Sequence, residues 1–344
     1  MPPKLKDIAE RAGVDIGTVS HVLNRRPKAD RLKAETRERI QRIAKELGYC
    51  RNELAASIAG GRGNVLAFIS AEMGCIEYTG RIQNGVLDEA AAQDYAVTVY
   101  HLTGKNEEEI IRKLIGWRTA GVIFHIARLD AAPRIMKILD EQKIPYGTAN
   151  LGNPRGIGVT TDDSRGMECA VEFLKQSGCR RAALLTHEDK SRQQAEYQKR
   201  RREGFRKGMK QHFPEAPETV FTLSPEQGKQ AFQRSMDQIL KKITGGGYDG
   251  ILCDSDITAI ELLQSAQTAG LKVPEAFSLI GYGNLGISSL MRPALTTLSQ
   301  NFEEIGSMTT RFVIDAVRNG QSAEQERNLL LPVKLIIRDS TQKT

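Results

Sequence analysis

The stretch KLKDIAERAGVDIGTVSHVLN, residues 4–24, decides the fold of the N-terminal part of the chain. Its first half carries apolar side chains at the spacing of one helix face, namely Leu5, Ile8, Ala9 and Ala12. Gly13 follows and permits the left-handed backbone that ends a helix. The carboxylate of Asp15 is then placed to cap a second helix. A helix, a tight glycine-containing turn and a second helix form a helix-turn-helix arrangement.

Two further helical patterns complete this N-terminal part. The second helix has an apolar stripe that we expect to be buried, consisting of Ile16, Val19, Val22 and Leu23. A polar, basic loop follows at residues 25–33. The third helix has its own apolar stripe, consisting of Ile40, Ile43, Ala44 and Leu47. Gly48 ends it, so the sequence predicts three helices within residues 1–50.

Residues 51–63 form a distinct joint. Residues 52–59 are compatible with two helical turns, and Gly60, Gly61 and Gly63 interrupt the pattern after them. A helix this short is marginal alone in water, where about 12–15 residues are needed. We therefore expect it to form only against a partner; an inert linker is the alternative.

From Val65 onward, short β-branched runs alternate with helical stretches. The predicted strands are 65–69, 96–100, 121–126, 144–148, 182–186, 220–223, 250–253 and 277–281. The helical stretches between them include 81–93, 106–117, 164–177, 226–243 and 256–269. This alternation predicts an α/β fold with parallel sheets that helices cover on both faces. Residues 64–344 exceed one such unit, so we expect two lobes with a ligand cleft beyond the carboxyl ends of the strands.

Positive charge is concentrated at the N-terminus. The 344 residues include 49 basic and 42 acidic side chains, a formal charge of +7. Residues 1–63 contain five lysines and nine arginines against three aspartates and five glutamates, so +6 of this charge lies there. A small basic module before a nearly neutral body is typical of a protein that binds nucleic acid. A solvated basic surface is the alternative.

Several classes of protein are disfavoured by composition. The hydrophobic fraction of 40% and charged fraction of 26% are those of a globular protein. The longest apolar run, residues 65–69, is far shorter than the about 20 residues that span a bilayer, and the N-terminus has no apolar signal core. The cysteines are scattered without a Cys-x-x-Cys pair, which predicts reduced thiols in the cytoplasm. They are Cys50, Cys75, Cys169, Cys179 and Cys253.

Taken together, these residues resemble the lactose-repressor/galactose-repressor family of bacterial transcription regulators along essentially the whole chain. The N-terminal motifs that carry the resemblance are Lys6-Asp7-Ile8-Ala9, Ala12-Gly13-Val14, Thr18-Val19-Ser20-His21-Val22-Leu23-Asn24, Thr36-Arg37-Glu38, Leu47-Gly48-Tyr49 and Asn52. Those in the remainder are Arg201-Arg202-Glu203-Gly204-Phe205, Gly281-Tyr282, Arg292-Pro293-Ala294-Leu295-Thr296-Thr297-Leu298, Leu331-Pro332 and Arg338-Asp339-Ser340-Thr341.

The resemblance implies three parts. They are a helix-turn-helix DNA-binding head at 1–50, a hinge helix and linker at 51–63, and a two-lobed body at 64–344 that is similar to periplasmic binding proteins. The first lobe is expected at about 64–160 and 294–320 and the second at about 161–291 and 325–341.

For the head, the resemblance implies that helix 15–24 enters the DNA major groove. The residues it assigns to DNA contact are Lys6, Ile16, Gly17, Thr18, Ser20, His21, Asn24 and Tyr49, with Asn52, Ala55 and Ile58 in the hinge. Ile16 offers an apolar contact to a thymine methyl, and His21 donates to guanine or to a phosphate. Gly17 has no side chain, so the helix backbone can come close to the DNA there. The alternatives are core packing for Ile16, a neutral spacer at Gly17 and a non-specific phosphate contact for His21. Ile58 matches the apolar wedge that paired hinge helices insert into the minor groove.

The chain departs from the family pattern at several places. The loop at 25–33 looks about three residues longer than usual, and Arg51 stands where a proline usually precedes the asparagine. Gly283-Asn284 follows Gly281-Tyr282 where sugar-binding members carry an aspartate. Residues 70–79 lack the Asn-Pro-aromatic run. These departures weigh against a standard sugar pocket.

The candidate effector contacts in the body are Arg201, Asp162, Leu223, Ser255, Asp256, Asn284 and Phe302. Arg201 aligns with an arginine that reaches the effector, and its fork of donors suits a carboxylate or phosphate as well as hydroxyls. The basic run at 199–202 is alternatively a solvated helix face.

The other candidates have structural alternatives too. Either Asp162 or Asp163 is a pocket acid or a helix cap, and Asp256 is a pocket residue or caps helix 256–269. Leu223 and Phe302 line the cleft or belong to the ordinary core.

No catalytic constellation is present. The sequence contains no Gly-x-Ser-x-Gly elbow, no Walker loop and no His-Glu-x-x-His motif, and its five histidines are dispersed. Residues 245–247 are three glycines that we expect to end a helix rather than to bind phosphate. We therefore expect neither an enzyme nor a metal or cofactor site.

The sequence thus predicts a sequence-specific DNA-binding transcription regulator, a repressor, located in the cytoplasm. We expect a homodimer on a pseudo-palindromic operator, because no room remains for a C-terminal heptad helix that would build a tetramer. A small polar effector, a sugar or sugar acid, is expected in the cleft. The rivals are a ligand-binding protein with a vestigial head, a regulator without a small-molecule effector, an activator, and an enzyme on the α/β body.

Overall fold

The computed structural model describes residues 3–24, 27–49, 63–72, 77–154, 156–187, 196–223, 229–320 and 327–342. The chain divides into two units. Residues 1–64 with 116–120 form the first, which we call the head, and residues 65–115 with 121–344 form the second, which we call the body.

The described part of the head consists of short helices around one core. They are α1 (Leu5–Ala12), α2 (Ile16–Leu23), the 3₁₀-helix η1 (Pro27–Arg31) and α3 (Ala34–Glu46). Their buried apolar residues form a single cluster of Ile8, Ala9, Ala12, Val19, Val22, Ala29, Ile40, Ile43 and Ala44. Gly13 ends α1 with a φ of 65°, and the side chain of Asp15 caps α2, as predicted.

Two details of the head differ from the sequence prediction. Ile16, the first residue of α2, is 48% exposed and does not belong to the buried stripe of this helix, which consists of Val19 and Val22. The loop at 25–33 is not irregular throughout, since residues 27–31 form η1 and bury Ala29 in the core. Helix α3 therefore begins at Ala34, with Lys33 as an N-cap that makes no side-chain hydrogen bond.

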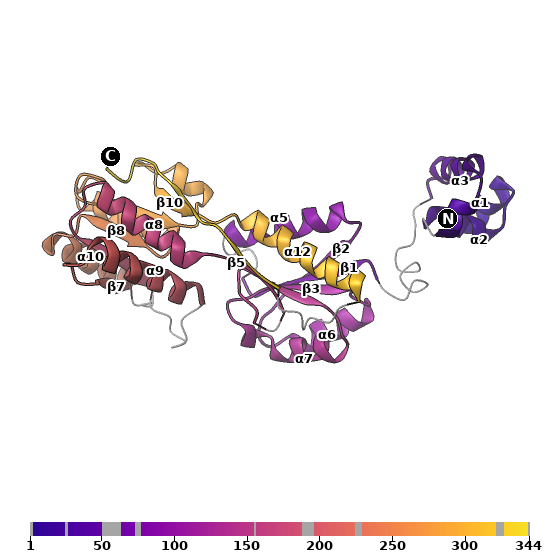
Figure 1. Ribbon diagram of the computed structural model, residues 1–344, viewed down its shortest axis with the longest axis horizontal. Coiled ribbons are helices and arrows are strands. Elements are labelled where there is room, and N and C mark those ends of the chain that lie inside the picture. Colours follow the sequence, from indigo (N-terminus) through magenta and orange to yellow (C-terminus); the bar gives the residue numbers. More distant parts are fainter. Residues whose placement is uncertain are drawn as a thin grey trace. The chain divides into compact units, whose positions relative to one another are not determined.

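The first lobe of the body is a six-stranded parallel sheet in the order β11-β5-β4-β3-β1-β2 (Figure 1). Its strands are β1 (Val65–Ser70), β2 (Ala96–His101), β3 (Gly121–His125), β4 (Tyr146–Ala149), β5 (Ile157–Thr161) and β11 (Arg327–Leu331). Helices α5 (Glu77–Ala92) and α12 (Phe302–Asn319) pack together on one face. Helices α6 (Glu107–Gly116) and α7 (Pro133–Glu141) cover the other face, with the short η2 (Leu129–Ala131) before α7.

The second lobe is also six-stranded, in the order β12-β10-β9-β8-β6-β7. Its strands are β6 (Ala182–His187), β7 (Val220–Leu223), β8 (Gly250–Cys253), β9 (Ser278–Tyr282), β10 (Thr296–Ser299) and β12 (Lys334–Ile336). Only the described pair β10–β12 is antiparallel. One face packs on α10 (Lys229–Gly245) and α11 (Asp256–Thr268), and the other on α8 (Asp163–Gln176) and α9 (Glu196–His212). The 3₁₀-helix η3 (Gly286–Ser289) follows β9.

The chain passes between the lobes at three places: after β5, after β10 and after β11. This corrects the predicted lobe boundaries near the C-terminus. Strand β10 lies in the second lobe although residues 294–320 were expected in the first, and β11 lies in the first lobe although 325–341 were expected in the second. The reason is that β11 pairs with β5, and β10 pairs with β9 and β12, at long range. The strand ranges named from sequence also omitted β5, β10, β11 and β12.

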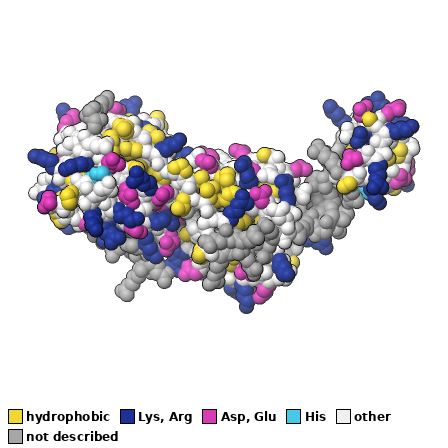
Figure 2. Space-filling view, viewed as in Figure 1, with side chains coloured by type: hydrophobic (Ala, Val, Ile, Leu, Met, Phe, Trp, Pro, Cys, Tyr) yellow, Lys and Arg dark blue, Asp and Glu magenta, His cyan; other side chains and the backbone are white. Residues whose placement is uncertain are grey.

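Surface and composition add three observations. On the face drawn in Figure 2, basic and acidic side chains are interspersed over the body, in agreement with its small net charge. Among the described helices, none is long and apolar enough to cross a membrane. The described cysteines, Cys169, Cys179 and Cys253, are free thiols.

Candidate functional site

The first candidate site is the N-terminal end of α2. Asp15 accepts a hydrogen bond from the backbone N of Thr18 at 2.8 Å and another from the Thr18 hydroxyl. These hydrogen bonds, the hydroxyl one first, lower the pKa of the Asp15 carboxyl. The cap leaves Ile16 and Gly17 exposed at the start of the helix. A Cβ atom at Gly17 would lie 2.9 Å from Asp15 Oδ1, so glycine here also serves the cap and is not a neutral spacer.

His21 lies one turn further along α2 and is half-buried. Its Nδ1 atom is buried and has no hydrogen-bond partner among the described residues. The Nδ1 atom itself is out of reach of an external partner because it is buried, and the rest of the half-buried ring is the part that can face one. Ile16, Gly17 and His21 therefore form the part of α2 that is open to a partner; the exposure of Ile16 excludes core packing as its role in the described head.

Three other predicted contact residues of α2 are engaged within the helix. The Thr18 hydroxyl is bonded to Asp15, and Asn24 Nδ2 donates to Ser20 Oγ at 3.0 Å. Of the remaining predicted contacts, Lys6 is exposed and pairs with Glu10 at 3.6 Å. Tyr49 is half-buried and packs against the core of the head.

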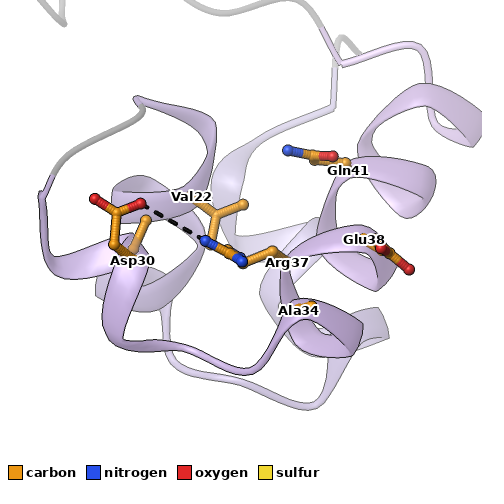
Figure 3. Close-up of a pocket in the computed structure, with 7 residues that line it drawn as sticks. Val22, Asp30, Ala34, Arg37, Glu38 and Gln41 are labelled. Atoms are coloured by element: carbon orange, nitrogen blue, oxygen red, sulfur yellow. Dashed lines mark ion pairs between the residues drawn. The ribbon is translucent and has the colours of Figure 1, made fainter.

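A hollow of about 350 Å³ lies between η1 and α3 (Figure 3). Its lining combines Val22, Ala29 and Ala34 with Asp30, Arg37, Glu38 and Gln41. Asp30 and Arg37 form an exposed ion pair at 3.6 Å across it. None of the predicted DNA contacts lines the hollow. The predicted hinge contacts Asn52, Ala55 and Ile58 lie outside the described residues.

The second candidate site is a cavity of about 230 Å³ between the two lobes of the body, which we call the interlobe cavity. It is lined by Tyr78, Asn150, Tyr197, Arg201, Ser255, Asp256, Ile257, Tyr282, Gly283, Leu285, Gln300 and Phe302. These residues come from the carboxyl ends of strands and the starts of helices in both lobes, where parallel sheets bind ligands. Of the seven predicted effector contacts, Arg201, Ser255, Asp256 and Phe302 are brought together here.

Arg201 is buried, and most of its N–H groups donate to protein acceptors. It is 6% exposed and donates to Asp254 O at 2.5 Å and to Gln300 Oε1 at 3.0 Å. It also pairs with Asp163 at 3.4 Å. Burial, the largest effect, disfavours the charged guanidinium, but Asp163 together with Tyr282, Tyr197 and Asp254 more than offsets it, so the pKa of Arg201 is raised. The basic run is therefore not a uniformly solvated face, and Arg201 is not the free cation that a sugar acid requires.

Asp163 is the acid on which this cluster converges. It is 1% exposed, accepts from Tyr282 OH at 2.6 Å, and pairs with Arg200 at 3.0 Å as well as with Arg201. Asp162, by contrast, caps α8 by accepting from Arg165 N at 3.0 Å and does not line the cavity. Between the two aspartates, the helix cap is thus Asp162, and Asp163 lies behind the cavity wall.

Asp256 lines the cavity but its oxygens are already used. They accept from Leu285 N at 2.7 Å, Ser288 Oγ at 2.7 Å and Thr297 Oγ1 at 2.5 Å. Burial, which these bonds only partly counter, raises the pKa of Asp256. The cap of α11 is Ser255, which accepts from Thr258 N at 3.1 Å. The suggestion that Asp256 caps this helix is therefore wrong.

Two predicted residues lie elsewhere. Leu223 is fully buried in the core of the second lobe and does not line the cavity. Asn284 has a φ of 50°, donates to Ser299 Oγ at 3.2 Å and accepts from Arg338 Nη2 at 2.7 Å. Sequence reasoning missed Tyr78, Asn150, Tyr197, Tyr282 and Gln300 as lining residues. For Asn150 and Tyr282 the available signal was that each stands just after the end of a predicted strand.

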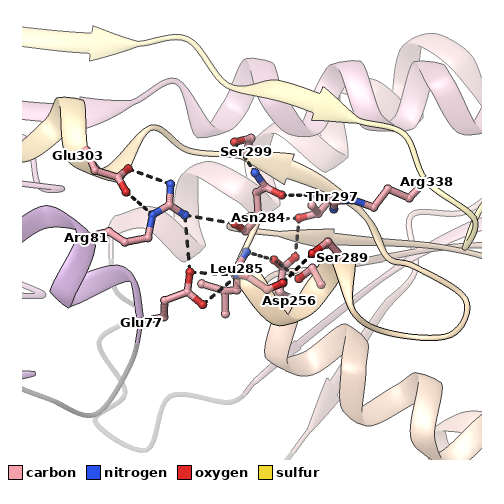
Figure 4. A network of polar contacts seen from close by, with 12 residues as sticks. Glu77, Arg81, Asp256, Asn284, Leu285, Ser289, Thr297, Ser299, Glu303 and Arg338 are labelled. Atoms are coloured by element: carbon pink, nitrogen blue, oxygen red, sulfur yellow. Dashed lines mark hydrogen bonds and ion pairs between the residues drawn. The ribbon is translucent and has the colours of Figure 1, made fainter.

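Asn284 also belongs to a network that joins the lobes, which we call the interlobe latch (Figure 4). Glu77 at the start of α5 accepts from Gly286 N with both oxygens, at 3.0 and 2.9 Å. Arg81 donates to Asn284 O at 3.2 Å and forms a bidentate pair with Glu303 at 2.7 and 2.8 Å. Segment 283–286, which replaces the usual ligand acid of the family, thus contacts the first lobe directly.

Comparison with known proteins gives the family. Residues 4–52 match the model described as bacterial regulatory proteins, lacI family, and residues 171–341 match the periplasmic binding protein-like domain. Catabolite control protein A of Staphylococcus epidermidis is 26% identical over 99% of this chain and 100% of that protein. The chain belongs to the lacI family of bacterial regulatory proteins. This lacI-family protein is therefore a DNA-binding transcription regulator, as its sequence predicted.

Two solved structures agree with the fold of the lacI-family chain. A lac repressor dimer bound to operator has a TM-score of 0.78 at 21% identity, covering 100% of both chains. The complex of transcriptional regulator CelR with cellobiose has a TM-score of 0.67 at 23% identity, covering 98% of this chain and 99% of that chain. The predicted fold, a helix-turn-helix head and a periplasmic-binding-protein-like body, is thus confirmed.

Proposed function

We propose that this regulator binds a pseudo-palindromic operator as a homodimer, acts as a repressor, and is controlled by a small ligand in the interlobe cavity. Each subunit would place α2 in the major groove of one half-site, and two-fold symmetry of the protein would match that of the DNA. The +6 charge of residues 1–63 supports binding to the phosphate backbone. The lac repressor structure with operator is dimeric, which supports the same assembly.

The observation that carries this proposal is the open surface of α2. Exposed Ile16 offers a methyl-rich side chain for the thymine methyl group, and the ring of His21 is half-exposed one turn further along α2. The hydroxyl of Thr18 and the amide of Asn24 are held within the helix, so they suit positioning more than base readout. Specificity would then depend on the few residues Ile16, Gly17 and His21.

Selection from random double-stranded DNA, followed by affinity measurement on single-base variants, tests this assignment. His21→Ala should relax preference at one position per half-site, by about 1–3 kcal/mol. His101→Ala, an exposed histidine of the body, is the matched control and should leave all affinities unchanged. Equal weakening on every sequence would mean that His21 contacts only phosphate. Failure of the wild-type chain to select any sequence would refute the proposed function.

Ligand control would operate through the arrangement of the two lobes. The interlobe cavity has walls from both lobes, so a ligand there would favour one lobe arrangement over another. That bias can be no larger than the difference between the ligand affinities of the two arrangements. A ligand seated in the cavity would raise the melting temperature of the whole chain by mass action.

A regulator that needs no small ligand is the second candidate. The interlobe latch favours it, because Glu77 and Arg81 hold the segment 284–286 of the opposite lobe through hydrogen bonds between protein groups. Operator affinity that no small molecule changes, in a chain whose lobes stay closed in solution scattering, would support this candidate over ligand control.

A further inference from the structure

We propose that the interlobe cavity takes an uncharged compound with a single flat ring and one hydrogen-bonding substituent. This inference rests on the proposed function of the body as a ligand-controlled module. It follows from three properties of the lining: its aromatic surface, the prior engagement of its charged groups, and the small number of polar groups that remain.

The walls are mainly aromatic. On the first lobe, Tyr78 stacks on Phe302, with ring centroids 5.4 Å apart and planes 28° apart. On the second lobe, Tyr197 and Tyr282 lie on either side of Arg201. Aromatic faces and edges favour other flat rings in offset or edge-to-face contact.

The charged groups of the lining are already compensated. Arg201 pairs with Asp163, and two of its remaining N–H groups reach Asp254 O and Gln300 Oε1, while both oxygens of Asp256 accept from the protein. An anionic ligand would therefore have to displace Asp163. A cationic ligand would find the aromatic faces already occupied by guanidinium groups. Arg201 Cζ lies 3.6 Å from the centroid of the Tyr282 ring, and Arg81 Cζ lies 5.2 Å from the centroid of the Phe302 ring.

Few polar groups remain for a ligand rich in hydroxyls. Gln300 donates to Thr161 Oγ1 at 2.7 Å and accepts from Arg201, and Ser255 caps α11. The Tyr78 hydroxyl donates to Glu72. Asn150 differs, because its side-chain amide has no hydrogen bond to any described residue although it lines the cavity. A hexose would bury several hydroxyls without partners, which is costly, whereas a single polar substituent can pair with Asn150.

The size of the cavity agrees with one ring. Its volume of about 230 Å³ exceeds the roughly 150 Å³ of an apolar cavity that binds benzene. It lies below the about 300–1,000 Å³ of sites for drug-sized molecules. A six-membered ring with a short substituent fits between these limits.

Benzamide and benzoate make a matched pair of probes, because they share the ring and differ in charge. Binding of benzamide, benzoate, toluene and glucose to the full chain would be measured by ligand-observed NMR and thermal shift, up to about 10 mM, since small fragments bind weakly. We expect benzamide and toluene to bind in a saturable way, and benzoate and glucose to bind at least tenfold more weakly than benzamide.

Two substitutions locate the binding. Asn150→Gly removes the amide at a position where φ is 65°, which glycine adopts freely, and should weaken benzamide about tenfold without changing toluene. Asp94→Gly, at an exposed position with φ of 66°, is the matched control and should change neither. Phe302→Leu should weaken both ring compounds; circular dichroism checks that it folds.

Three results would overturn the inference: benzoate or glucose binding as tightly as benzamide, no saturable binding of any ring compound, or benzamide binding that Asn150→Gly leaves unchanged. Selection of operator DNA with the same protein preparation distinguishes failure of the proposed ligand class from failure of the proposed function. Selected DNA binding without ring binding rejects only the ligand class, whereas loss of selected DNA binding rejects the proposed function itself.

Discussion

Arg81→Met tests whether the interlobe latch holds the segment after β9. Methionine keeps the apolar stem of Arg81 against Phe302 but removes the two hydrogen bonds to Glu303 and the one to Asn284 O. Nearby Glu77 retains its contact to Gly286 N. The substitution therefore removes half of the latch without opening a large void in the described structure.

The magnitude follows from the contacts and their exposure. A hydrogen bond to a charged group contributes about 1.5–3 kcal/mol, but exposed ion pairs contribute at most about 1 kcal/mol. Only the bond from Arg81 to Asn284 O holds the second lobe, since Glu303 belongs to the first lobe, and with Arg81 24% exposed the loss at segment 283–289 is about 1–2 kcal/mol. The hydrogen bonds with Glu303 raise the pKa of Arg81 and lower that of Glu303. Lowering the free energy of local opening by 1–2 kcal/mol raises the population of the open state by a factor of about 5–30.

Amide hydrogen exchange followed by mass spectrometry measures this opening. Peptides that contain residues 283–289 should exchange about 5- to 30-fold faster in Arg81→Met than in the wild type. Arg311→Met is the matched control, since Arg311 pairs with Glu89 at 2.8 Å between α5 and α12 and contacts no described residue of the second lobe. If Arg81→Met and Arg311→Met give the same exchange at 283–289, the latch does not hold the lobes together and the reasoning is wrong.

Three further predictions concern Gly17 in the head, Glu89 in the body, and the share of the DNA affinity that the head provides. Replacing glycine by alanine inside a helix usually raises the free energy of unfolding by roughly 1 kcal/mol. Gly17→Ala should not give this gain, because the new Cβ would crowd Asp15, whereas Gly80→Ala has open space and should stabilise the chain. Equal gains for the two variants in urea unfolding would contradict this account. Hydrogen bonds, that of Arg311 first, lower the pKa of Glu89 from 4.5 to about 2, so its stabilisation is present above pH 4.5 and lost as the pH falls towards 2. The difference in unfolding free energy between wild type and Glu89→Gln should be about 1–2 kcal/mol at pH 7 and shrink by pH 3; a constant difference would refute the linkage. A fragment of residues 64–344 should lose nearly all DNA affinity, and the affinity of the whole chain should fall with salt with a slope of about −0.9 per neutralised phosphate; tight binding by the fragment in a gel shift would reverse the assignment.

The local features of this protein were determined by the sequence itself. Gly13 and Asp15 set the end of α1 and the start of α2, because a left-handed backbone and a side-chain cap depend on residues within one turn. The alternation of β-branched runs and helical stretches likewise determined parallel sheets covered by helices. The concentration of charge in residues 1–63 is a property of composition and pointed to nucleic acid without any structure.

Other features were decided only by tertiary structure, because they depend on pairs of residues far apart in the chain. Strand β11 joins the first lobe by pairing with β5, and no local pattern marks that choice. The basic run at 199–202 does not reveal that Arg201 turns inward to Asp163, since the partner acid stands 38 positions earlier. In the same way, the aromatic walls of the interlobe cavity come from four separate elements that only the folded chain brings together. Long-range packing therefore decided which charges are available to a ligand, while short-range chemistry decided the helices, strands and DNA-binding module.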